Sequence, residues 1–272
     1  MNIRIASWNI AGGHKVASLE HFDYLPKDIP YFAEQLINLA PDVVCLQESH
    51  TKINGTDSNA SDLAKFLGME IVVNSPNSPS HIDSEYLLGN AIVSKLKPKT
   101  VIEKYYPDPK EQLYWSNGKP ADIHKKNLEY VAFEEFNVAN NQMLPIKLFG
   151  FTYDDNDKGS DFAKEINRVM SETVKTPVIW CGDFNFFEPL KIYSFMNELN
   201  LKEALPDVTT RPSQDGQKKK SDHIYYSPEF ELLKSGVIMT ETDHYLCFAE
   251  FEFQTNPHHL MGKLSLCGTL FR

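Results

Sequence analysis

The chain has 272 residues, of which 42% are hydrophobic and 24% charged, a composition typical of a globular protein. Its net charge of −10 argues weakly against a broad basic surface for duplex nucleic acid. No leader-like segment precedes the strand-like residues 3–8, and no apolar run has the length of a membrane span, so we expect neither a signal peptide nor a transmembrane segment.

The first part of the chain alternates short apolar runs with segments of helical spacing. Residues 14–29 have no clear period, and we expect a loop there. The apolar runs predict strands at 3–8, 43–46, 69–73 and 89–94, and the helical patterns predict helices at 30–40 and 61–67.

The second part repeats this alternation after an irregular segment at 105–127, which we expect to be a surface insertion. Strands interleaved with helices in both parts indicate one α/β domain over residues 1–254, followed by a tail at 255–272 of unknown role. The predicted strands are 128–138, 144–153, 178–181, 224–227, 231–238 and 245–253, and the predicted helices are 161–174 and 189–199.

The cysteines are spread along the chain and form no CxxC pair. Cys45, Cys181 and Cys247 lie inside apolar runs, where a reduced cysteine behaves as a small hydrophobic residue, and Cys267 lies in the tail. This pattern is typical of a reducing compartment, and we expect a cytoplasmic protein.

The apolar run 178–181 ends at Gly182 and is followed by Asp183 and Asn185. A buried strand cannot hold an unpaired carboxylate, so Asp183 is expected at the strand end, where it meets water, a partner or a metal ion. In an extended chain Asp183 and Asn185 point to the same side, because side chains alternate with a period of two. The sequence therefore places an acid and an amide together at the rim of a sheet.

Other predicted strands are flanked by polar groups in the same way. Asn9 follows the first strand, Glu48 follows 43–46, and the pairs Asp222-His223 and Asp243-His244 precede later strands. Ligands of α/β sheets bind outside such strand ends. Carboxylate and amide oxygens without thiolates suit Mg²⁺ or Mn²⁺, and Mg²⁺ commonly shares its shell with substrate phosphate, which favours phosphoester chemistry.

Each of these motifs alone also has a structural explanation. Asn9 can cap the turn at Gly12, Glu48 can be a surface acid, and Asp183 with Asn185 can form a local turn. Either Asp-His pair can be a solvated strand flank. Their combination at successive strand ends is what favours a site.

The motifs, in their order along the chain, resemble those of the endonuclease/exonuclease/phosphatase superfamily. The resemblance extends from about residue 3 to residue 253 and implies a four-layer α/β sandwich, in which two packed mixed β-sheets are flanked by helices. The motifs are Trp8-Asn9, Gln47-Glu48, Gly89-Asn90-Ala91-Ile92-Val93-Ser94, Gly182-Asp183-Phe184-Asn185, Ser221-Asp222-His223-Ile224 and Thr242-Asp243-His244.

The resemblance also implies a metal site. Glu48 corresponds to the principal metal ligand, assisted by Asn9, and Asp243 completes the shell directly or through water. The expected cofactor is Mg²⁺, with Mn²⁺ as a substitute.

The catalytic groups are implied in the same way. Asp183 corresponds to the residue that orients or deprotonates the attacking water, and Asn185 to one that holds a phosphate oxygen or Asp183 itself. His244 corresponds to the histidine that contacts the phosphate and assists proton transfer, and Asp222 to the acid that orients it. A carboxylate behind an imidazole fixes its tautomer and favours the imidazolium.

One position departs from the family. Many members carry a histidine at the end of the strand that precedes the Asp183 strand, and the sequence comparison places Tyr153 there. Abasic-site endonucleases have a tyrosine at roughly this place, so we expect the Tyr153 phenol to donate to phosphate.

The expected function is therefore that of a Mg²⁺-dependent phosphodiesterase or nuclease that cleaves nucleic acid or a nucleotide conjugate by in-line attack of water. Two alternatives remain open from the sequence. One is a phosphatase or phosphodiesterase of a small molecule or lipid headgroup, such as an inositol phosphate. The other is a catalytically inactive binding module with the same fold.

Overall fold

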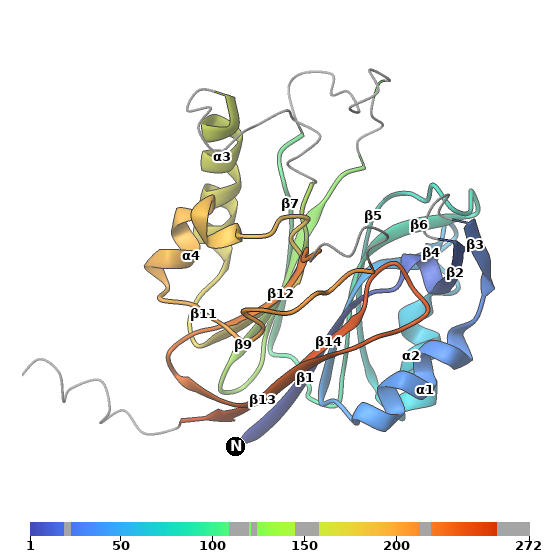
Figure 1. The fold of residues 1–272 in the computed structure, drawn as a ribbon, viewed down its shortest axis with the longest axis horizontal. Coiled ribbons are helices and arrows are strands. Elements are labelled where there is room, and N and C mark those ends of the chain that lie inside the picture. The colour runs from blue at the N-terminus through green and yellow to red at the C-terminus, as the bar shows by residue number, and fades with distance from the viewer. Residues whose placement is uncertain (19–22, 109–119, 121–123, 145–157, 213–218, 255–272) are drawn as a thin grey trace, which may run out of the picture.

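Two six-stranded sheets pack face to face, and helices cover their outer faces (Figure 1). This arrangement is the four-layer α/β sandwich that the sequence predicts. The computed structural model describes residues 1–18, 23–108, 120, 124–144, 158–212 and 219–254. The predicted tail at 255–272 lies outside these residues.

The first sheet has the strand order β13-β14-β1-β4-β6-β5. It is mixed, because β1 is parallel to β4 and antiparallel to β14. Helices α1 and α2 cover its outer face (Figure 1). The bounds are β1 Asn2–Asn9, β4 Val43–Lys52, β5 Ile71–Pro79, β6 Tyr86–Ser94, β13 Phe230–Ile238, β14 Leu246–Phe253, α1 Ile29–Leu39 and α2 Asn59–Leu67.

The second sheet has the order β11-β12-β10-β9-β8-β7, with β10 parallel to β9 and antiparallel to β12. Helices α3 and α4 cover its outer face (Figure 1). The bounds are β7 Thr100–Tyr105, β8 Asn127–Ala132, β9 Asn137–Gln142, β10 Val178–Asp183, β11 Lys202–Glu203, β12 Asp222–Tyr226, α3 Lys158–Thr173 and α4 Ser194–Glu198, with the 3₁₀ turns η1 Ala11–Gly13 and η3 Pro189–Lys191.

The alternation of side chains along β10 explains how both faces of a sheet are buried. Ile179 and Cys181 face the first sheet and join the core between the sheets. Val178 and Trp180 point the other way, into the core beneath α3 and α4. A strand covered on both faces has a continuously apolar sequence, which is the pattern that identified residues 178–181 as a strand.

The helices on the first sheet begin and end at residues suited to those positions. The Asp28 side chain accepts a hydrogen bond from the Tyr31 amide at the start of α1, and Ser58 caps α2 through the Ser61 amide. Gly68 ends α2 in the left-handed conformation, as the sequence predicts. Within the described residues, no helix is both long and apolar enough to cross a membrane.

Two predictions of secondary structure were wrong. The expected loop at 14–29 contains a hairpin, β2 (His14–Ser18) and β3 (Asp23–Lys27), whose register is irregular, so it lacks a clean period of two. The single strand expected at 128–138 is instead the end of β8 and the start of β9, because the chain turns at 133–136, where the Phe133 amide donates to the Phe136 carbonyl. The strand expected at 144–153 lies, apart from residue 144, outside the described residues. Two phenylalanines in this turn extended the apolar run and concealed it.

A belt of buried amide side chains joins the two sheets near the ends of their central strands. Asn140 of β9 is bonded to Gln47 of β4 at 2.7 Å, and Asn90 of β6 donates to the Asn127 side chain of β8 at 2.9 Å. Asn140 also donates to Glu129 of β8 at 3.3 Å. Because a buried amide loses stability when it is unpaired, these bonds fix the alignment of the sheets beside the strand ends that carry the candidate site.

Candidate active site

The carboxyl ends of the central strands and the segment before β14 bring the predicted polar residues to one end of the sandwich. Asn9 ends β1, Asp183 ends β10 and Asp222 begins β12, while Asp243 and His244 precede β14. The Asn9 amide donates to Asp183 Oδ2 across the two sheets at 3.3 Å. The structure thus brings together residues that lie far apart in the sequence.

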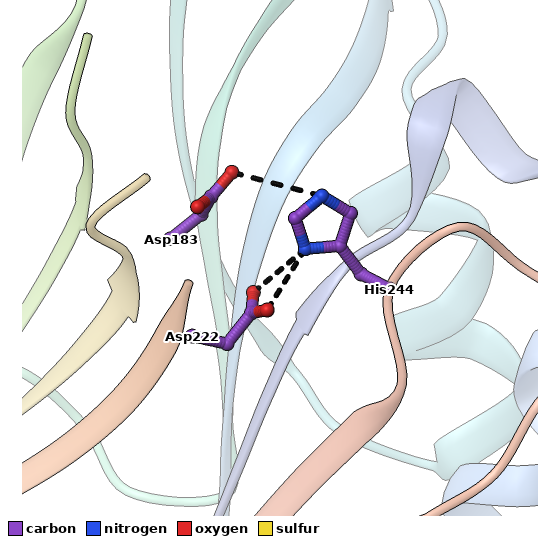
Figure 2. A group of neighbouring side chains, drawn as sticks. All are labelled: Asp183, Asp222 and His244. Carbon is purple, nitrogen blue, oxygen red and sulfur yellow. Dashed lines mark hydrogen bonds and ion pairs between the residues drawn. The ribbon is translucent and has the colours of Figure 1, made fainter. Parts of the chain in front are cut away.

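His244 lies between two carboxylates, and its two ring nitrogens face one each (Figure 2). Nδ1 lies 3.0 and 2.9 Å from the two carboxylate oxygens of Asp222, and Nε2 lies 3.8 Å from Asp183 Oδ2. All three side chains are buried. The backbone carbonyl of His244 accepts a hydrogen bond from the Trp8 indole at 3.0 Å, which anchors the main chain beneath the ring.

The surrounding charges set the protonation states of this group. Burial and Arg211 act to lower the pKa of His244, but Asp222, Asp183 and Asp243 outweigh them and raise it to about 9. Burial acts to raise the pKa of Asp222, but His244 lowers it below its ordinary value. The arrangement therefore favours an imidazolium bonded to an ionised Asp222.

Asp183 is positioned by the turn that ends β10. Its Oδ1 accepts from the Asn185 backbone amide at 2.9 Å, and the Asn185 side chain donates to the Met143 carbonyl at 2.8 Å. Gly182, with φ +147°, allows the close approach of β9, because a Cβ there would lie 2.0 Å from the Asn141 carbonyl oxygen. Burial is the largest influence on Asp183 and raises its pKa.

Glu48 lies on β4 at a register shift against β6 and has a left-handed φ of +51°. A residue other than glycine in this conformation is strained, and such strain is common at functional sites. Its Oε1 accepts from Gln142 Nε2 at 2.6 Å, and Gln142 Oε1 accepts from Lys126 Nζ at 2.6 Å. A buried lysine is thus connected to Glu48 through one amide.

The neighbouring side chains keep Glu48 ionised. Burial acts to raise its pKa, but Lys126, His81 and His244 outweigh it and lower the pKa to about 2. Burial lowers the pKa of Lys126, while Glu48 and Asp183 act to raise it. Glu48 is therefore a carboxylate at any pH near neutrality.

Asp243 completes the carboxylate group opposite Glu48. Its backbone carbonyl accepts from Arg211 Nε at 3.3 Å, and its Oδ2 lies 3.7 Å from Arg211 Nη2. Its Oδ1 is buried without a protein partner. An orphaned carboxylate oxygen, together with the carboxylate of Glu48 and the amide of Asn9, fits a hard divalent cation.

A second group of candidate metal ligands consists of His244 and the two carboxylates beside it. Among the described residues, Asp183, Asp222 and His244 offer ligand atoms that lie within 4.8 Å of one another. His244 Nδ1 is, however, bonded to both oxygens of Asp222, so this nitrogen has no capacity for a cation. These three residues are better suited to moving and holding a proton than to enclosing a cation.

Tyr153 lies outside the described residues. The strand that pairs with β10 is β9, and it ends at Gln142, so Gln142 stands where the sequence comparison placed Tyr153. The sequence analysis also missed Lys126 and Arg211. Lys126 directly precedes β8, so its place beside an apolar strand was a signal that could have identified it. Arg211 lies in a loop whose sequence gives no such signal.

Solved structures share this fold. An endonuclease/exonuclease/phosphatase from Beutenbergia cavernae has a TM-score of 0.69 and 17% identity, over 93% of this chain and 72% of that one. A mannosyl-6-phosphatase from Bacteroides thetaiotaomicron has a TM-score of 0.60 and 15% identity, over 92% of this chain and 100% of that one. A 3′ phosphatase from Neisseria, bound to product DNA hairpin, has a TM-score of 0.55 and 18% identity, over 92% of this chain and 100% of that one.

Sequence comparison identifies the family. A search of curated proteins finds no match. The profile of the endonuclease/exonuclease/phosphatase family matches residues 6–244, which include both ends of the candidate site, from Asn9 to His244. The chain belongs to the endonuclease/exonuclease/phosphatase family, whose members are hydrolytic phosphoesterases.

Proposed function

We propose that this protein is a Mg²⁺-dependent phosphoester hydrolase that cleaves its substrate by in-line attack of water. The observation that carries the proposal is the buried group of Asp222, His244 and Asp183, in which one imidazole nitrogen is held by a carboxylate and the other faces a second carboxylate. Phosphoryl transfer depends on positioning and charge neutralisation more than on covalent catalysis, and this group supplies both.

Asp183 is the residue that orients and deprotonates the attacking water. Its Oδ1 is held by the Asn185 amide and its Oδ2 by Asn9, so the carboxylate is fixed before substrate binds. Burial raises the pKa of Asp183, which makes it a better proton acceptor than a solvated aspartate. Asn185 supports Asp183 through its backbone, and its carboxamide is anchored on Met143.

His244 stabilises the negative charge of the phosphate and assists proton transfer through Nε2. The pKa of about 9 makes the ring an imidazolium at neutral pH. Asp222 holds Nδ1 and thereby fixes the orientation of the ring. The reaction leaves a proton on Asp183 and moves one from His244 toward the leaving oxygen, so both groups return to their starting states by exchange with solvent.

The metal site we propose consists of Glu48, Asn9 and Asp243, with Mg²⁺ as cofactor and Mn²⁺ as a substitute. When bound, the cation polarises the phosphoryl oxygens and neutralises their charge. Lys126 acts on this site through Gln142, which orients Glu48. Tyr153 remains a predicted phosphate contact, and Gln142 occupies the strand end at which that contact was expected.

The preferred substrate is nucleic acid or a nucleotide conjugate. The 3′ phosphatase with a similar fold, bound to product DNA hairpin, supports this choice. The second candidate is a small-molecule phosphatase, which the mannosyl-6-phosphatase of the same fold supports. A binding module without activity has no physical need for the buried carboxylate–imidazole group.

The location we propose is the cytoplasm. It is supported by three buried cysteines that form no disulfide, Cys45, Cys181 and Cys247.

Hydrolysis of bis-para-nitrophenyl phosphate, measured with Mg²⁺, with Mn²⁺ and with excess EDTA, tests the reaction class. We expect turnover that EDTA abolishes and that Asp183→Ala reduces by at least about a thousandfold. Turnover equal to that of Asp183→Ala under all conditions would exclude the hydrolase. A panel of single-stranded DNA, RNA, abasic duplex, 5′-tyrosyl DNA and inositol phosphates at one salt concentration then ranks the substrates.

A further inference from the structure

A row of aromatic rings borders the candidate active site at the Glu48 side. Four of its members are histidines, and they come from separate segments of the chain. The neighbouring ring centroids are 5.5 Å apart for His124–His81, 6.4 Å for His81–Tyr24, 6.2 Å for Tyr24–His14, 5.8 Å for His14–His50 and 5.0 Å for His50–Tyr86.

His50, a buried member of the row, holds the turn that carries His81. His50 lies on β4 beyond Glu48, and its Nε2 is 2.7 Å from Ser80 Oγ. Ser80 Oγ accepts from the amides of Ile82 and Asp83 at 3.0 and 3.1 Å, so its hydroxyl donates to His50.

The hairpin that carries Tyr24 is fixed in a similar way. His14 Nδ1 donates to the Leu25 carbonyl at 2.7 Å, which ties β2 to β3 beside Tyr24. The His50 ring packs directly on Gly12, where a Cβ would lie 2.3 Å from His50 Cε1. The row therefore contains one buried ring, His50, which bonds to Ser80 in the turn of His81 and packs against His14 of the hairpin that carries Tyr24.

Tyr24 lies near the proposed metal ligands Asp243 and Glu48, and His81 is its neighbour in the row. Burial raises the pKa of Tyr24, and the charges of Asp243 and Glu48 raise it further. His50 lies two residues beyond Glu48 on β4, and the ring contacts continue from it through His14 and Tyr24 to His81. His81 is exposed and Tyr24 is half-buried, so both rings reach solvent next to the place where a phosphoester would bind.

We propose that His81 and Tyr24 form a stacking subsite for a nucleobase that is joined, through its sugar, to the phosphoester cleaved at Asp183. Histidine and tyrosine rings are surfaces on which unstacked bases bind, and a base stacks without regard to its hydrogen-bonding edge. The subsite rests on the proposed function, because it selects among phosphoesters those that carry a base. It assigns the nucleotide class of substrate and not a particular sequence.

Binding can be tested without turnover. The full-length chain is titrated, in the absence of divalent cations, with adenosine 5′-monophosphate and separately with ribose 5-phosphate, which has the same phosphate but no base. We expect the His81 ring proton resonance, assigned by its loss in His81→Gln, to shift upfield with the nucleotide and to remain unchanged with the sugar phosphate. Equal shifts with both ligands would identify a phosphate subsite, and no shift with either would identify a structural row; both results overturn the proposal.

Activity provides the second test. We expect His81→Ala and Tyr24→Leu each to lower kcat/KM about tenfold for a single-stranded oligonucleotide. The loss should be smaller for an oligomer of the same length and charge built from abasic tetrahydrofuran residues, which carry no base to stack. Phe66→Ala, an exposed aromatic residue on α2, is the control and should affect neither substrate.

Equal losses on the two oligomers would overturn the subsite while leaving the hydrolase intact. If the wild-type chain cleaves neither oligomer, the proposed nucleic-acid activity fails. The titration with nucleotide and sugar phosphate then still decides whether the base subsite exists.

Discussion

Lys126 is buried, yet its ammonium group donates to the amide oxygen of Gln142 and not to the nearby Glu48 carboxylate. Gln142 in turn donates to Glu48. The amide thus stands between the lysine and the carboxylate, so that Glu48 forms no direct ion pair with Lys126. Through this connection the positive charge of Lys126 acts on the proposed metal site, although the lysine does not bind there.

Lys126→Met is expected to raise the pKa of Glu48 from about 2, because Lys126 is the first of the cations that lower it. The unpaired Gln142 also loses its orientation. We expect the Mg²⁺ concentration for half-maximal activity to rise roughly 10–100-fold. Lys125→Met changes the exposed neighbouring lysine and is the matched control. Equal Mg²⁺ dependence in the two variants would show that Lys126 has only a packing role.

Asp222→Asn is expected to lower the pKa of His244 from about 9, because the Asp222 carboxylate is one of the charges that raise it while burial lowers it. The imidazolium is then lost at a lower pH, so the alkaline limb of the kcat profile should move to lower pH. The ring nitrogen shifts of His244 give the same pKa independently of turnover. Asp207→Asn, an exposed aspartate in the preceding loop, should leave both measurements unchanged.

Among the strands, β8 carries the most unusual group of the belt between the sheets. Burial raises the pKa of Glu129 to about 8, although the hydrogen bonds from Asn140 and Ser75 oppose this. The folded chain therefore retains a proton on Glu129 over a range of pH in which the unfolded chain, with its ordinary pKa of 4.5, has lost it. A rise in pH through this range favours the unfolded state.

Glu129→Gln is expected to remove this dependence. In the wild-type chain the contribution of Glu129 to the free energy of unfolding falls by up to about 1.4 kcal/mol per pH unit between the two pKa values. Urea unfolding at about pH 5 and about pH 8 should show a smaller difference in Glu129→Gln than in the wild type. Glu135→Gln, at an exposed site in the next turn, should retain the wild-type difference. An unchanged difference in Glu129→Gln would mean that Glu129 is ionised in the folded state.

The elements differ in how well their sequences predict them. The run 178–181 is predicted correctly as β10, because it is covered on both faces and ends at a glycine that β9 requires. The turn between β8 and β9 is missed, because Phe133 and Phe136 pack into the core as strand residues would. The polar residues at strand ends follow from local sequence, whereas Arg211 and the ring row depend on tertiary contacts between distant segments.

For the molecule as a whole, the core between the two sheets determines whether a site exists. Phe251 of β14 is fully buried, and its ring lies 5.1 Å from that of Tyr226 on β12, across the sheet interface. Phe251→Ala is expected to lower the free energy of unfolding by about 3–5 kcal/mol. Phe66→Ala, at a 52% exposed position on α2, should change it by less than about 0.5 kcal/mol. Urea unfolding of both variants measures this, and similar values would contradict the packing role of Phe251.

The belt of amides between the sheets has a consequence for the precision of the site. Glu48 lies on β4 of the first sheet and His244 directly before β14 of the same sheet, whereas Asp183 and Asp222 lie on strands of the second sheet. A slip of one residue along a strand moves it by about 3.3 Å, which exceeds the 2.9 Å separation of His244 and Asp222. The geometry of the hydrolytic centre therefore depends on how the two sheets are aligned. A shift of one sheet against the other that is too small to alter the secondary structure should still lower the catalytic rate.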